Sequence, residues 1–382
     1  SLSGQSVMTM VKHFPGGGPQ LDGLDPHLKS GESQVYPGDH FDYHLAPFIA
    51  AIENDMRVVM PYYGIPTGQT DEDVAMAYNR QILTDLLRDQ LGFEGVICTD
   101  WGVVTGRIWG VEPLTVEERY LKSIEAGVDQ YGGESDPEYI VNLVNQGAIS
   151  EARIDESVRR ILRNKFDLGL FDTPFVDEAE VNALVNLPEY VSLGMTAQRN
   201  AVVLLDNGSG ALPLAAGTQI FVDGLDPTVA AKYGTVVDTP DDADVVLLFL
   251  NTVFNGNQPA GTDRTLDQMM ATRFPDTNLS FNKEILAKAA SYRDVSQLVT
   301  LVDLNRPAVL TELKGMSGAL VGTFGVSDDA MLDVVFGRHN PLGKLPFELP
   351  SSMAEVEAQL EDVPDDTANP LFPYGWGLSY EE

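Results

Sequence analysis

The sequence contains a single cysteine, Cys98, and five histidines among 382 residues. One thiol cannot form a disulfide within the chain or a cysteine-based metal cluster. No two histidines lie one helical turn apart around a glutamate, which is the arrangement of a common zinc motif. His40 and His44 are four residues apart, but Asp42 and Tyr43 lie between them, and both histidines are expected at the surface or at a helix start. The sequence therefore predicts no bound metal.

Basic side chains and long apolar runs are also scarce. The chain has 24 Lys and Arg against 57 Asp and Glu, which gives a formal net charge of -33. A surface of this charge repels nucleic acid and anionic membranes, so neither is an expected partner. No apolar stretch approaches the roughly 20 residues that a helix needs to cross a bilayer.

The length and the order of the predicted elements indicate two α/β domains. A chain of 382 residues exceeds what one hydrophobic core usually holds. In the first 170 residues, short apolar segments alternate with helical patterns, which is typical of a parallel sheet with helical crossovers. Strands are predicted over residues 7–14, 57–60, 96–99 and 128–131, and helices over residues 41–53, 74–91, 116–126 and 138–145 and from Ser150 onward.

The first domain, residues 1–170, is predicted to be the C-terminal half of a (β/α)8-type barrel. It holds about four strand–helix units, whereas a closed barrel of this type needs about eight. Four units leave two open sheet edges and a partly covered core, which is unfavourable for an isolated chain. We therefore expect the first half of the barrel to be absent from this sequence and to belong to a second chain, a cleaved fragment or a lost region.

A linker is predicted over residues 171–191, where acids and breakers such as Pro174 and Pro188 gather. Residues 192–382 are then predicted to form a second α/β domain with a layered open sheet. Its strands are expected over residues 201–205, 219–222, 245–250, 298–302, 319–324 and 344–349, and its helices over residues 193–200, 282–292 and 330–336.

The strongest chemical signal lies in residues 93–102, which read Phe-Glu-Gly-Val-Ile-Cys-Thr-Asp-Trp-Gly. The apolar run predicts a buried strand that ends at Asp100 and Trp101. In barrels of alternating strands and helices, functional residues lie at the carboxyl ends of the strands. An indole packs on the apolar face of a sugar ring, and a carboxylate can attack or stabilise a cationic anomeric carbon. Asp100 as a turn former and Trp101 as a core residue are the alternatives, but their adjacency at a strand end favours a carbohydrate site.

Lys12 and His13 end the first predicted strand and precede a Pro-Gly-Gly-Gly loop. Unpaired buried charge is costly, so these side chains are expected to donate hydrogen bonds to ligand hydroxyls. A phosphate loop of a nucleotide-binding protein is the weaker alternative, because it needs Gly-Lys-Ser/Thr after the glycines. Met60 and Tyr63 follow the next strand, where they either pack in the core or contact the ligand. Cys98 is expected to pack as a small apolar group.

Four segments, in order along the whole chain, resemble glycoside hydrolase family 3. They read KHFPGGG at residues 12–18, GFEGVICTDWG at residues 92–102, RILRNKFDLGLFD at residues 160–172 and NPLFPYGWGLSY at residues 369–380. The resemblance implies a barrel followed by an α/β sandwich domain, and hydrolysis of terminal sugars with retention. The mechanism that it implies needs no metal and no organic cofactor.

By position, the resemblance implies that Asp100 is the nucleophile and that Lys12 and His13 hold sugar hydroxyls. It also implies that three residues line the first sugar site: Met60, Tyr63 and Trp101. The family further holds the ring with an aspartate and an arginine from the earlier part of the barrel, and those positions are not in this sequence. Activity of this chain by itself is therefore in question.

The general acid/base has two candidate origins. Many members of the family supply a glutamate near a Glu-Gly-x-Asp-Arg stretch of the second domain, but residues 260–264 here read Ala-Gly-Thr-Asp-Arg. The carboxylates nearby are Asp263, Asp267 and, in a helical pattern typical of a solvated face, Glu284. Hexosaminidase members use an Asp-x-His pair, and this chain has Asp25-Pro26-His27 in the loop after the first strand. Both origins stay open.

The predicted function is that of a retaining exo-β-glycosidase, which hydrolyses terminal β-linked glucose through a covalent glycosyl-enzyme. The expected partners are β-glucosides or short β-linked oligosaccharides, a complementing polypeptide with the first half of the barrel and, as an option, further copies of the chain. A β-N-acetylglucosaminidase that uses the Asp-His pair is an alternative. A sugar-binding remnant without catalysis is an alternative of another class.

Overall fold

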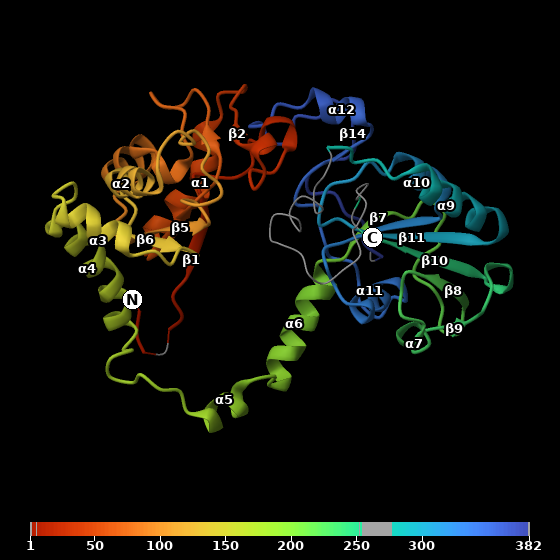
Figure 1. The fold of residues 1–382 in the computed structure, drawn as a ribbon. Helices are drawn as coiled ribbons and strands as arrows, with labels where there is room; N and C mark the ends of the chain where they lie inside the picture. Colours follow the sequence, from red (N-terminus) through yellow and green to blue (C-terminus); the bar gives the residue numbers. More distant parts are fainter. Residues whose placement is uncertain (1, 5, 252, 254–276, 381–382) are drawn as a thin grey trace. The chain divides into compact units, whose positions relative to one another are not determined.

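The computed structural model describes residues 2–4, 6–251, 253 and 277–380 (Figure 1). Over these residues the chain divides into two compact units. Unit 1 comprises the residues up to Glu178 together with Leu360–Val363, and unit 2 comprises most of the remainder. The domain limits 1–170, 171–191 and 192–382 stay predictions.

Unit 1 is built on a four-stranded parallel sheet with the strand order β1-β3-β5-β6. The strands are β1 (Met10–Phe14), β3 (Val58–Pro61), β5 (Val96–Trp101) and β6 (Gln130–Gly132). The helical segments are η1 (Leu21–Gly23), η2 (Lys29–Gly31), α1 (Phe41–Glu53), η3 (Met76–Tyr78), η4 (Gln81–Gln90), α2 (Val116–Ala126), α3 (Glu138–Asn145) and α4 (Glu151–Asp167). Two short strands, β2 (Ser33–Gln34) and β4 (Ile65–Pro66), pair with each other. The predicted parallel strand–helix units are thus confirmed, whereas their being half of a closed barrel stays a prediction.

Local sequence signals set the ends of the helices in unit 1. Thr115 and Glu118 form a reciprocal capping box at the start of α2, and Gly127 ends this helix with a φ of 121°. Ser150 accepts a hydrogen bond from the backbone of Arg153 and caps α4, as predicted. The helices predicted over residues 41–53, 116–126 and 138–145 are confirmed with these bounds.

The prediction of a single helix over residues 74–91 was wrong, because the helical conformation is interrupted at Asn79. This buried residue is extended (φ −96°, ψ 104°), and its side-chain oxygen accepts the N–H of Ile82 at 3.2 Å. Its amide donates to Thr70 Oγ1 at 2.7 Å. A side chain that bonds the neighbouring backbone in this way competes with the helix, so a 3₁₀ turn and a separate wide helix form instead.

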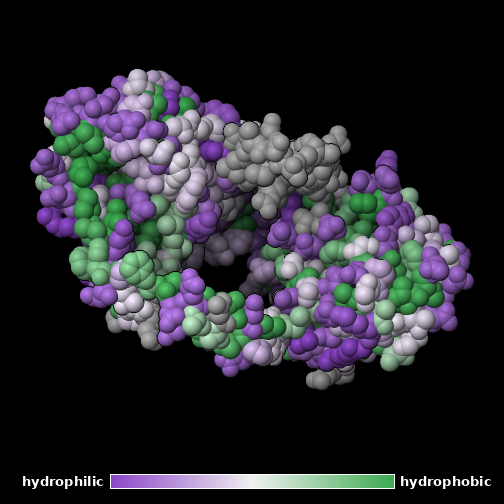
Figure 2. All heavy atoms as spheres, turned by 60° about the horizontal axis from the view of Figure 1, so that its bottom comes forward, coloured by the Kyte–Doolittle hydropathy of each residue, from purple (hydrophilic) through white to green (hydrophobic). Residues whose placement is uncertain are grey.

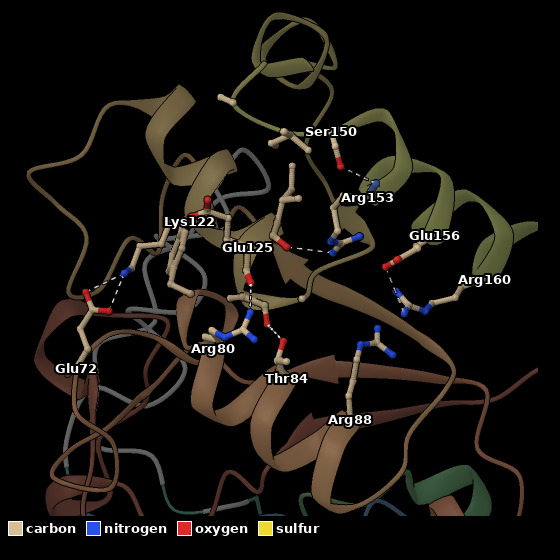
Figure 3. A pocket seen from close by; sticks show the side chains of 16 residues that line it. Glu72, Arg80, Thr84, Arg88, Lys122, Glu125, Ser150, Arg153, Glu156 and Arg160 are labelled. Atoms are coloured by element: carbon tan, nitrogen blue, oxygen red, sulfur yellow. Dashed lines mark hydrogen bonds and ion pairs between the residues drawn. The ribbon is translucent and has the colours of Figure 1, made fainter. Parts of the chain in front are cut away.

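Asp129 joins three elements of unit 1 just before β6. Its carboxylate is fully buried, and it accepts hydrogen bonds from Arg88 (2.6 Å), Arg160 (2.8 Å) and the Ser157 hydroxyl (2.7 Å). Arg153 lies 3.8 Å from the same carboxylate. Burial lowers the pKa of Arg88 to about 10, against the raising effect of Asp129. The three arginines line a cavity of about 720 Å³ (Figure 3), which therefore lies at the amino end of β6.

Unit 2 contains a six-stranded sheet with the order β7-β12-β11-β10-β8-β9. All neighbours are parallel except β7, which runs antiparallel to β12 at one edge. The strands are β7 (Val203–Asp206), β8 (Gln219–Asp223), β9 (Thr235–Val236), β10 (Val245–Leu250), β11 (Gln297–Asp303) and β12 (Ala319–Thr323). The helices of this unit are α5 (Glu178–Leu184), which begins at the boundary, α6 (Pro188–Asn200), α7 (Pro227–Ala230), α9 (Lys283–Val295), α10 (Thr311–Met316), α11 (Asp328–Val335) and α12 (Met353–Ala358).

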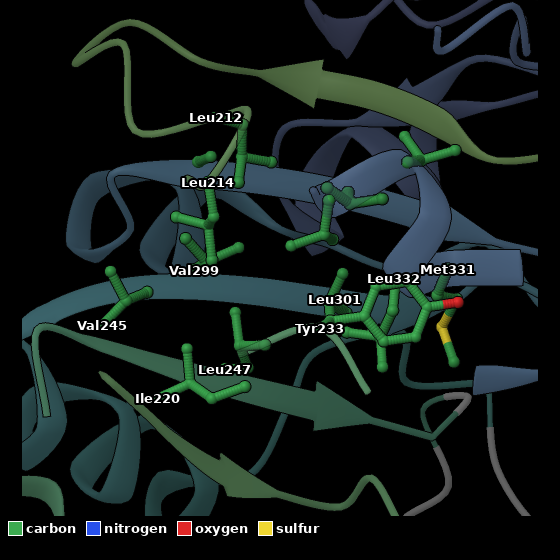
Figure 4. Close-up of a cluster of buried hydrophobic side chains, with 14 of the residues drawn as sticks. Leu212, Leu214, Ile220, Tyr233, Val245, Leu247, Val299, Leu301, Met331 and Leu332 are labelled. Atoms are coloured by element: carbon green, nitrogen blue, oxygen red, sulfur yellow. The ribbon is translucent and has the colours of Figure 1, made fainter. Parts of the chain in front are cut away.

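The sheet of unit 2 separates two hydrophobic clusters, because side chains alternate along each strand. On β10, Leu247 contributes to one cluster and Leu248 to the other. Met331 and Leu332 of α11 cover the first cluster (Figure 4), whereas Ala289 of α9 belongs to the second. The predicted layered α/β arrangement is therefore confirmed.

One strand prediction in unit 2 was wrong in extent. Of the strand predicted over residues 344–349, only Leu349 pairs, in the short strand β13 (Leu349–Pro350) next to β14 (Pro370–Phe372). The segment predicted as a linker contains α5 and the start of α6. Pro188 occupies the first turn of α6, where proline is tolerated. A proline thus starts a helix where it was expected to break one.

Unit 1 leaves apolar side chains uncovered. Val7, Met8 and Met10 are exposed in and before β1, and Phe166 and Phe171 are exposed at the end of α4 and after it. Figure 2 shows hydrophobic residues in green at the surface of this unit. Among the described residues, no helix has the length and apolar character needed to span a membrane. The same residues contain no group of three or more side chains suited to hold a metal ion.

Replacing Asp129 by alanine is expected to destabilise unit 1 by about 3–5 kcal/mol, because it leaves partly buried arginines without their shared, fully buried counter-ion. Chemical denaturation followed by tryptophan fluorescence measures this loss, with Trp376→Phe as the background so that only Trp101 and Trp109 of unit 1 report. The control is Asp155→Ala, which removes an exposed pair with Arg159 and should cost about 0.5 kcal/mol or less. Equal losses in the two variants would contradict the role given to Asp129.

Candidate active site

The predicted site residues lie at the carboxyl ends of three adjacent parallel strands. Lys12 pairs in register with Met60 on β1 and β3, and β3 pairs with β5, which ends with Asp100 and Trp101. Because parallel strands end at the same edge of a sheet, residues about 40 positions apart in sequence meet there. His13 follows Lys12 and reaches Asp100 across this edge, with Nε2 at 3.1 Å from Oδ2.

Asp100 is an ionised carboxylate held by donors from several segments. Besides His13, the backbone N–H of Trp101 donates to Oδ1 at 2.7 Å. Partial burial raises the pKa of Asp100, but the hydrogen bonds from His13, Trp101 and Tyr63, with the charge of His13, outweigh burial and hold the pKa below 3.8. Its side chain keeps 13% of its surface exposed, so a ligand can approach it.

Tyr63 supports the strand end that carries Asp100. The residue is buried, and its hydroxyl donates to the Trp101 carbonyl at 2.7 Å. Burial, and next the charge of Asp100, raise the pKa of Tyr63 well above its usual value, so the phenol stays protonated. Met60 is also buried, with 2% of its surface exposed, and it forms part of the strand wall.

Trp101 is 51% exposed although it is a large aromatic residue. Its indole lies on the backbone of Gly132 and Gly133, where a Cβ at Gly133 would come within 2.4 Å of the ring. Glycine at position 133 also has a φ of 69°, which other residues rarely adopt. The sequence thus packs the indole on backbone without side chains and leaves the rest of the ring open to solvent. Such a ring can serve as a platform for a sugar face.

Lys12 is exposed and lines, with His13, a cavity of about 430 Å³ beside β1. Tyr43 and His44 of α1 form another wall of this cavity. Cys98, in contrast, points into a small cluster with Val58, Val96 and Ile161. Burial, and next the charge of Asp100, raise the pKa of the Cys98 thiol to about 11, in keeping with a packing role.

The loop after β1 brings His27 to the same place. Its Nδ1 lies 2.6 Å from Oδ1 of Asp25, and its ring contacts the Tyr63 ring edge-on with 4.8 Å between centroids. Burial raises the pKa of Asp25, but the hydrogen bonds from His27 outweigh this and lower it. The indole N–H of Trp109 donates to the Pro26 carbonyl at 2.8 Å and so fixes the middle of the Asp-Pro-His segment.

The other acid/base candidates are not brought to this edge by any described contact. Asp263 and Asp267 lie outside the described residues. Glu284 is exposed in the first turn of α9 in unit 2, where a negative charge suits the helix N-terminus. This placement matches the solvated helix face that its pattern predicted.

Two residues near the site had no signal in the sequence. The Tyr62 ring lies 5.3 Å from the His13 imidazole, and its hydroxyl receives a hydrogen bond from Gln20. The guanidinium of Arg107, a buried residue, lies 5.7 Å from the Tyr63 ring centroid. Alternation along the strand exit could have suggested that Tyr62 and Tyr63 face different sides, but nothing local points Arg107 to the site.

The pKa of Asp100 is expected below 3.8 in the native chain and higher in His13→Leu, because the leucine removes a donor to the carboxylate. Since the folded-state pKa lies below the unfolded one, the carboxylate contributes stability above pH 3.8, which is lost as the pH falls through the folded value. A carboxyl ¹³C NMR titration measures the midpoint, with His40→Leu at the exposed start of α1 as the control. The same Asp100 midpoint in both variants would contradict this account.

Comparisons with known proteins agree with the architecture. The model described as "Glycosyl hydrolase family 3 N terminal domain" matches residues 1–164, and the model of the C-terminal domain of the same family matches residues 230–380. A crystal structure of a β-glucosidase from Listeria innocua in complex with isofagomine has a similar fold, with a TM-score of 0.78 and 22% identity over 99% of this chain and 59% of that one.

Two curated relatives extend the similarity over the full sequence. Beta-glucosidase C of Emericella nidulans is 45% identical over 100% of this chain and 62% of its own length. The periplasmic beta-glucosidase/beta-xylosidase of Dickeya chrysanthemi is 37% identical over 99% of this chain and 61% of its own length. The chain therefore spans about three fifths of these relatives. With both family models matched in order, it belongs to glycosyl hydrolase family 3.

Proposed function

We propose that this chain carries the nucleophile of a retaining exo-β-glucosidase. The observation that supports this is an ionised Asp100 at the carboxyl end of a parallel strand, held by His13 and flanked by the exposed ring of Trp101. The names of the relatives favour glucosides as the substrate class, since one is a β-glucosidase and the other a β-glucosidase/β-xylosidase. Aryl β-glucosides and short β-linked oligosaccharides are the substrates proposed.

In the first step, a carboxylate oxygen of Asp100 forms a bond to the anomeric carbon as the bond to the leaving oxygen breaks. The donors from His13 and Trp101 keep the carboxylate charged and fix the direction of its free lone pairs. An acid gives a proton to the leaving oxygen. In the second step the same group takes a proton from water, which attacks the anomeric carbon and releases Asp100. The proposed roles of Lys12 and Trp101 are to bind the hydroxyls and one face of the sugar ring.

We propose His27 as this acid/base, with Asp25 as its positioning partner. Asp25 fixes the Nδ1 side of the imidazole, which leaves Nε2 to exchange the proton. The edge-on contact with Tyr63 holds the ring next to the residue that supports Asp100. The other candidate for the acid/base is the carboxylate of Asp263 or of Asp267.

A complementing polypeptide with the first half of the barrel is part of this proposal. The chain covers about three fifths of its relatives, and apolar side chains are exposed in and just before the edge strand β1, at Met10, Val7 and Met8. Exposed apolar residues along a sheet edge mark a surface that is covered in the stable state. The cavity beside β1 borders the same edge. Self-association of the chain remains a further prediction.

The substitution Asp100→Asn is expected to lower the rate of aryl β-glucoside hydrolysis by roughly 10⁴–10⁶-fold, because the amide cannot form the glycosyl-enzyme. The rate is measured for the chain with and without a co-expressed first half of the barrel taken from a relative. Asp89→Asn, on the exposed face of η4, is the matched control and should keep the parent rate. A parent-like rate for Asp100→Asn would refute the nucleophile.

Two other outcomes, one from the hydrolysis assay and one from that assay combined with calorimetry, would replace the proposal. Faster hydrolysis of the aryl N-acetylglucosaminide than of the glucoside would identify a β-N-acetylglucosaminidase. Glucose binding by calorimetry, with no hydrolysis in the presence of the complementing half, would identify a sugar-binding remnant.

Replacing His27 by alanine is expected to lower the hydrolysis rate of glucosides with poor leaving groups by about 10²–10⁴-fold. The hydrolysis rate of activated aryl glucosides should fall far less, because only poor leaving groups need the proton. Hydrolysis rates for a series of aryl glucosides, whose phenol leaving groups have increasing pKa values, measure this difference. His339→Ala in unit 2 is the control histidine. Equal losses across the series would assign the acid/base to another residue.

A further inference from the structure

A four-residue segment from far along the sequence, Leu360–Val363, belongs to unit 1. It packs on the loop that precedes α1, in which Gly38 and His40 lie. The side chain of Glu361 accepts the N–H of Asp22 at 3.4 Å in the same loop region. The loop that follows β1 is therefore held by residues more than 300 positions later in the sequence.

Asp362 makes the principal contacts of this segment. It is 1% exposed, and its two carboxylate oxygens accept the backbone N–H groups of Gly38 and His40, each at 2.8 Å. Hydrogen bonds of an ionised acceptor to backbone N–H groups are among the stronger ones in proteins. Loss of the carboxylate would leave these N–H groups without their acceptor in a site from which water is largely excluded.

Gly38 shows how closely the segment fits the loop. A Cβ at this position would lie 2.2 Å from Cγ2 of Val363 and 3.0 Å from Oδ1 of Asp362. The φ of Gly38 is not in the left-handed region, so the restriction is steric. A single methyl group there would push the segment and the loop apart.

His44 connects this contact to the glycine-rich loop after β1. Its Nε2 lies 3.1 Å from the Asp362 carbonyl oxygen. Its side chain packs so closely on the loop that a Cβ at Gly16 would lie 2.9 Å from His44 Cβ, and one at Gly18 would lie 3.1 Å from His44 Cε1. Gly16 lies two residues after the end of β1 and three residues after His13, and its N–H donates to the His13 carbonyl at 2.8 Å.

We infer that Asp362 is a positioning residue for His13. The Asp362 carboxylate anchors the segment to the loop, and this places the Asp362 backbone carbonyl against His44. His44 packs on Gly16 and Gly18, and the N–H of Gly16 donates to the carbonyl of His13, whose imidazole contacts Asp100. Asp362 touches neither Asp100 nor any ligand, so it acts through the placement of the imidazole. Its importance for turnover rests on the proposed function, whereas its effect on His13 does not.

The test uses the full chain with ¹³C-labelled histidine, whose five ring signals report each imidazole separately. Asp362→Ala is expected to displace the His44 and His13 signals and to leave the His339 signal of unit 2 unchanged. Asp362→Asn keeps one acceptor oxygen and should displace both less. Glu357→Ala, on the exposed side of α12, is the matched control and should displace none of them.

Gly38→Ala and His44→Ala change the two contacts of Asp362 from the side of the loop and of α1. They keep the inference testable if Asp362→Ala fails to fold. Both are expected to displace the His13 signal at temperatures well below unfolding. A His13 signal that stays at its parent position when the His44 signal moves would overturn the inference, and so would equal displacement of all five signals.

Turnover provides the second readout once glucosidase activity is established. Misplacement of a catalytic group by a fraction of an ångström to 1 Å lowers kcat, so Asp362→Ala should reduce kcat by about tenfold with KM nearly unchanged. A loss confined to KM would contradict a positioning role. Because the NMR measurement needs no catalysis, failure of the proposed function and failure of this inference are separable.

Discussion

The hydrogen bond between His13 and Asp100 is the interaction on which the site depends. Asp100 follows the buried residues of its strand, and burial by itself would raise the pKa of its carboxyl group, whereas the donors lower it. The imidazole reaches it from the end of β1, with β3 lying between the two strands. The parallel sheet, with its aligned carboxyl ends, brings His13 Nε2 and Asp100 Oδ2 to within 3.1 Å of each other.

The aspartates at the two ends of this sheet, Asp129 and Asp100, differ in burial and in hydrogen bonding. Asp129, before β6, is fully enclosed and bonded by two arginines and a serine, with a third arginine close by. Asp100, at the other end of the sheet, is partly exposed and keeps lone pairs that no described donor occupies. The first arrangement stabilises the packing of α4 and η4, and the second leaves an anion ready to react. Burial and the number of donors, rather than residue type, separate a structural aspartate from a candidate nucleophile.

The loop between β1 and α1 is ordered by contacts from distant parts of the sequence. Trp109 fixes Pro26, and Asp362 holds Gly38 and His40. Within the loop, Gln34 donates to the Gly16 carbonyl at 2.9 Å. Without such contacts, conformational entropy would favour many conformations of a long loop that has little regular structure. Glycines allow these close approaches because a side chain would collide with His44 or Val363.

The sequence by itself determined the strand–helix alternation, most element positions and the adjacency of Asp100 and Trp101, because hydrophobic periodicity, helix caps and residue order are local properties. It also located Lys12, His13 and the Asp25–His27 pair as candidates. The tertiary structure alone decided that His13 contacts Asp100, that the Asp25–His27 pair lies against Tyr63, and that Asn79 divides a predicted helix. The contacts of Asp362 and Arg107 were likewise decided only by the fold, because pairing between residues far apart in sequence depends on sheet order and loop packing, which leave no local pattern.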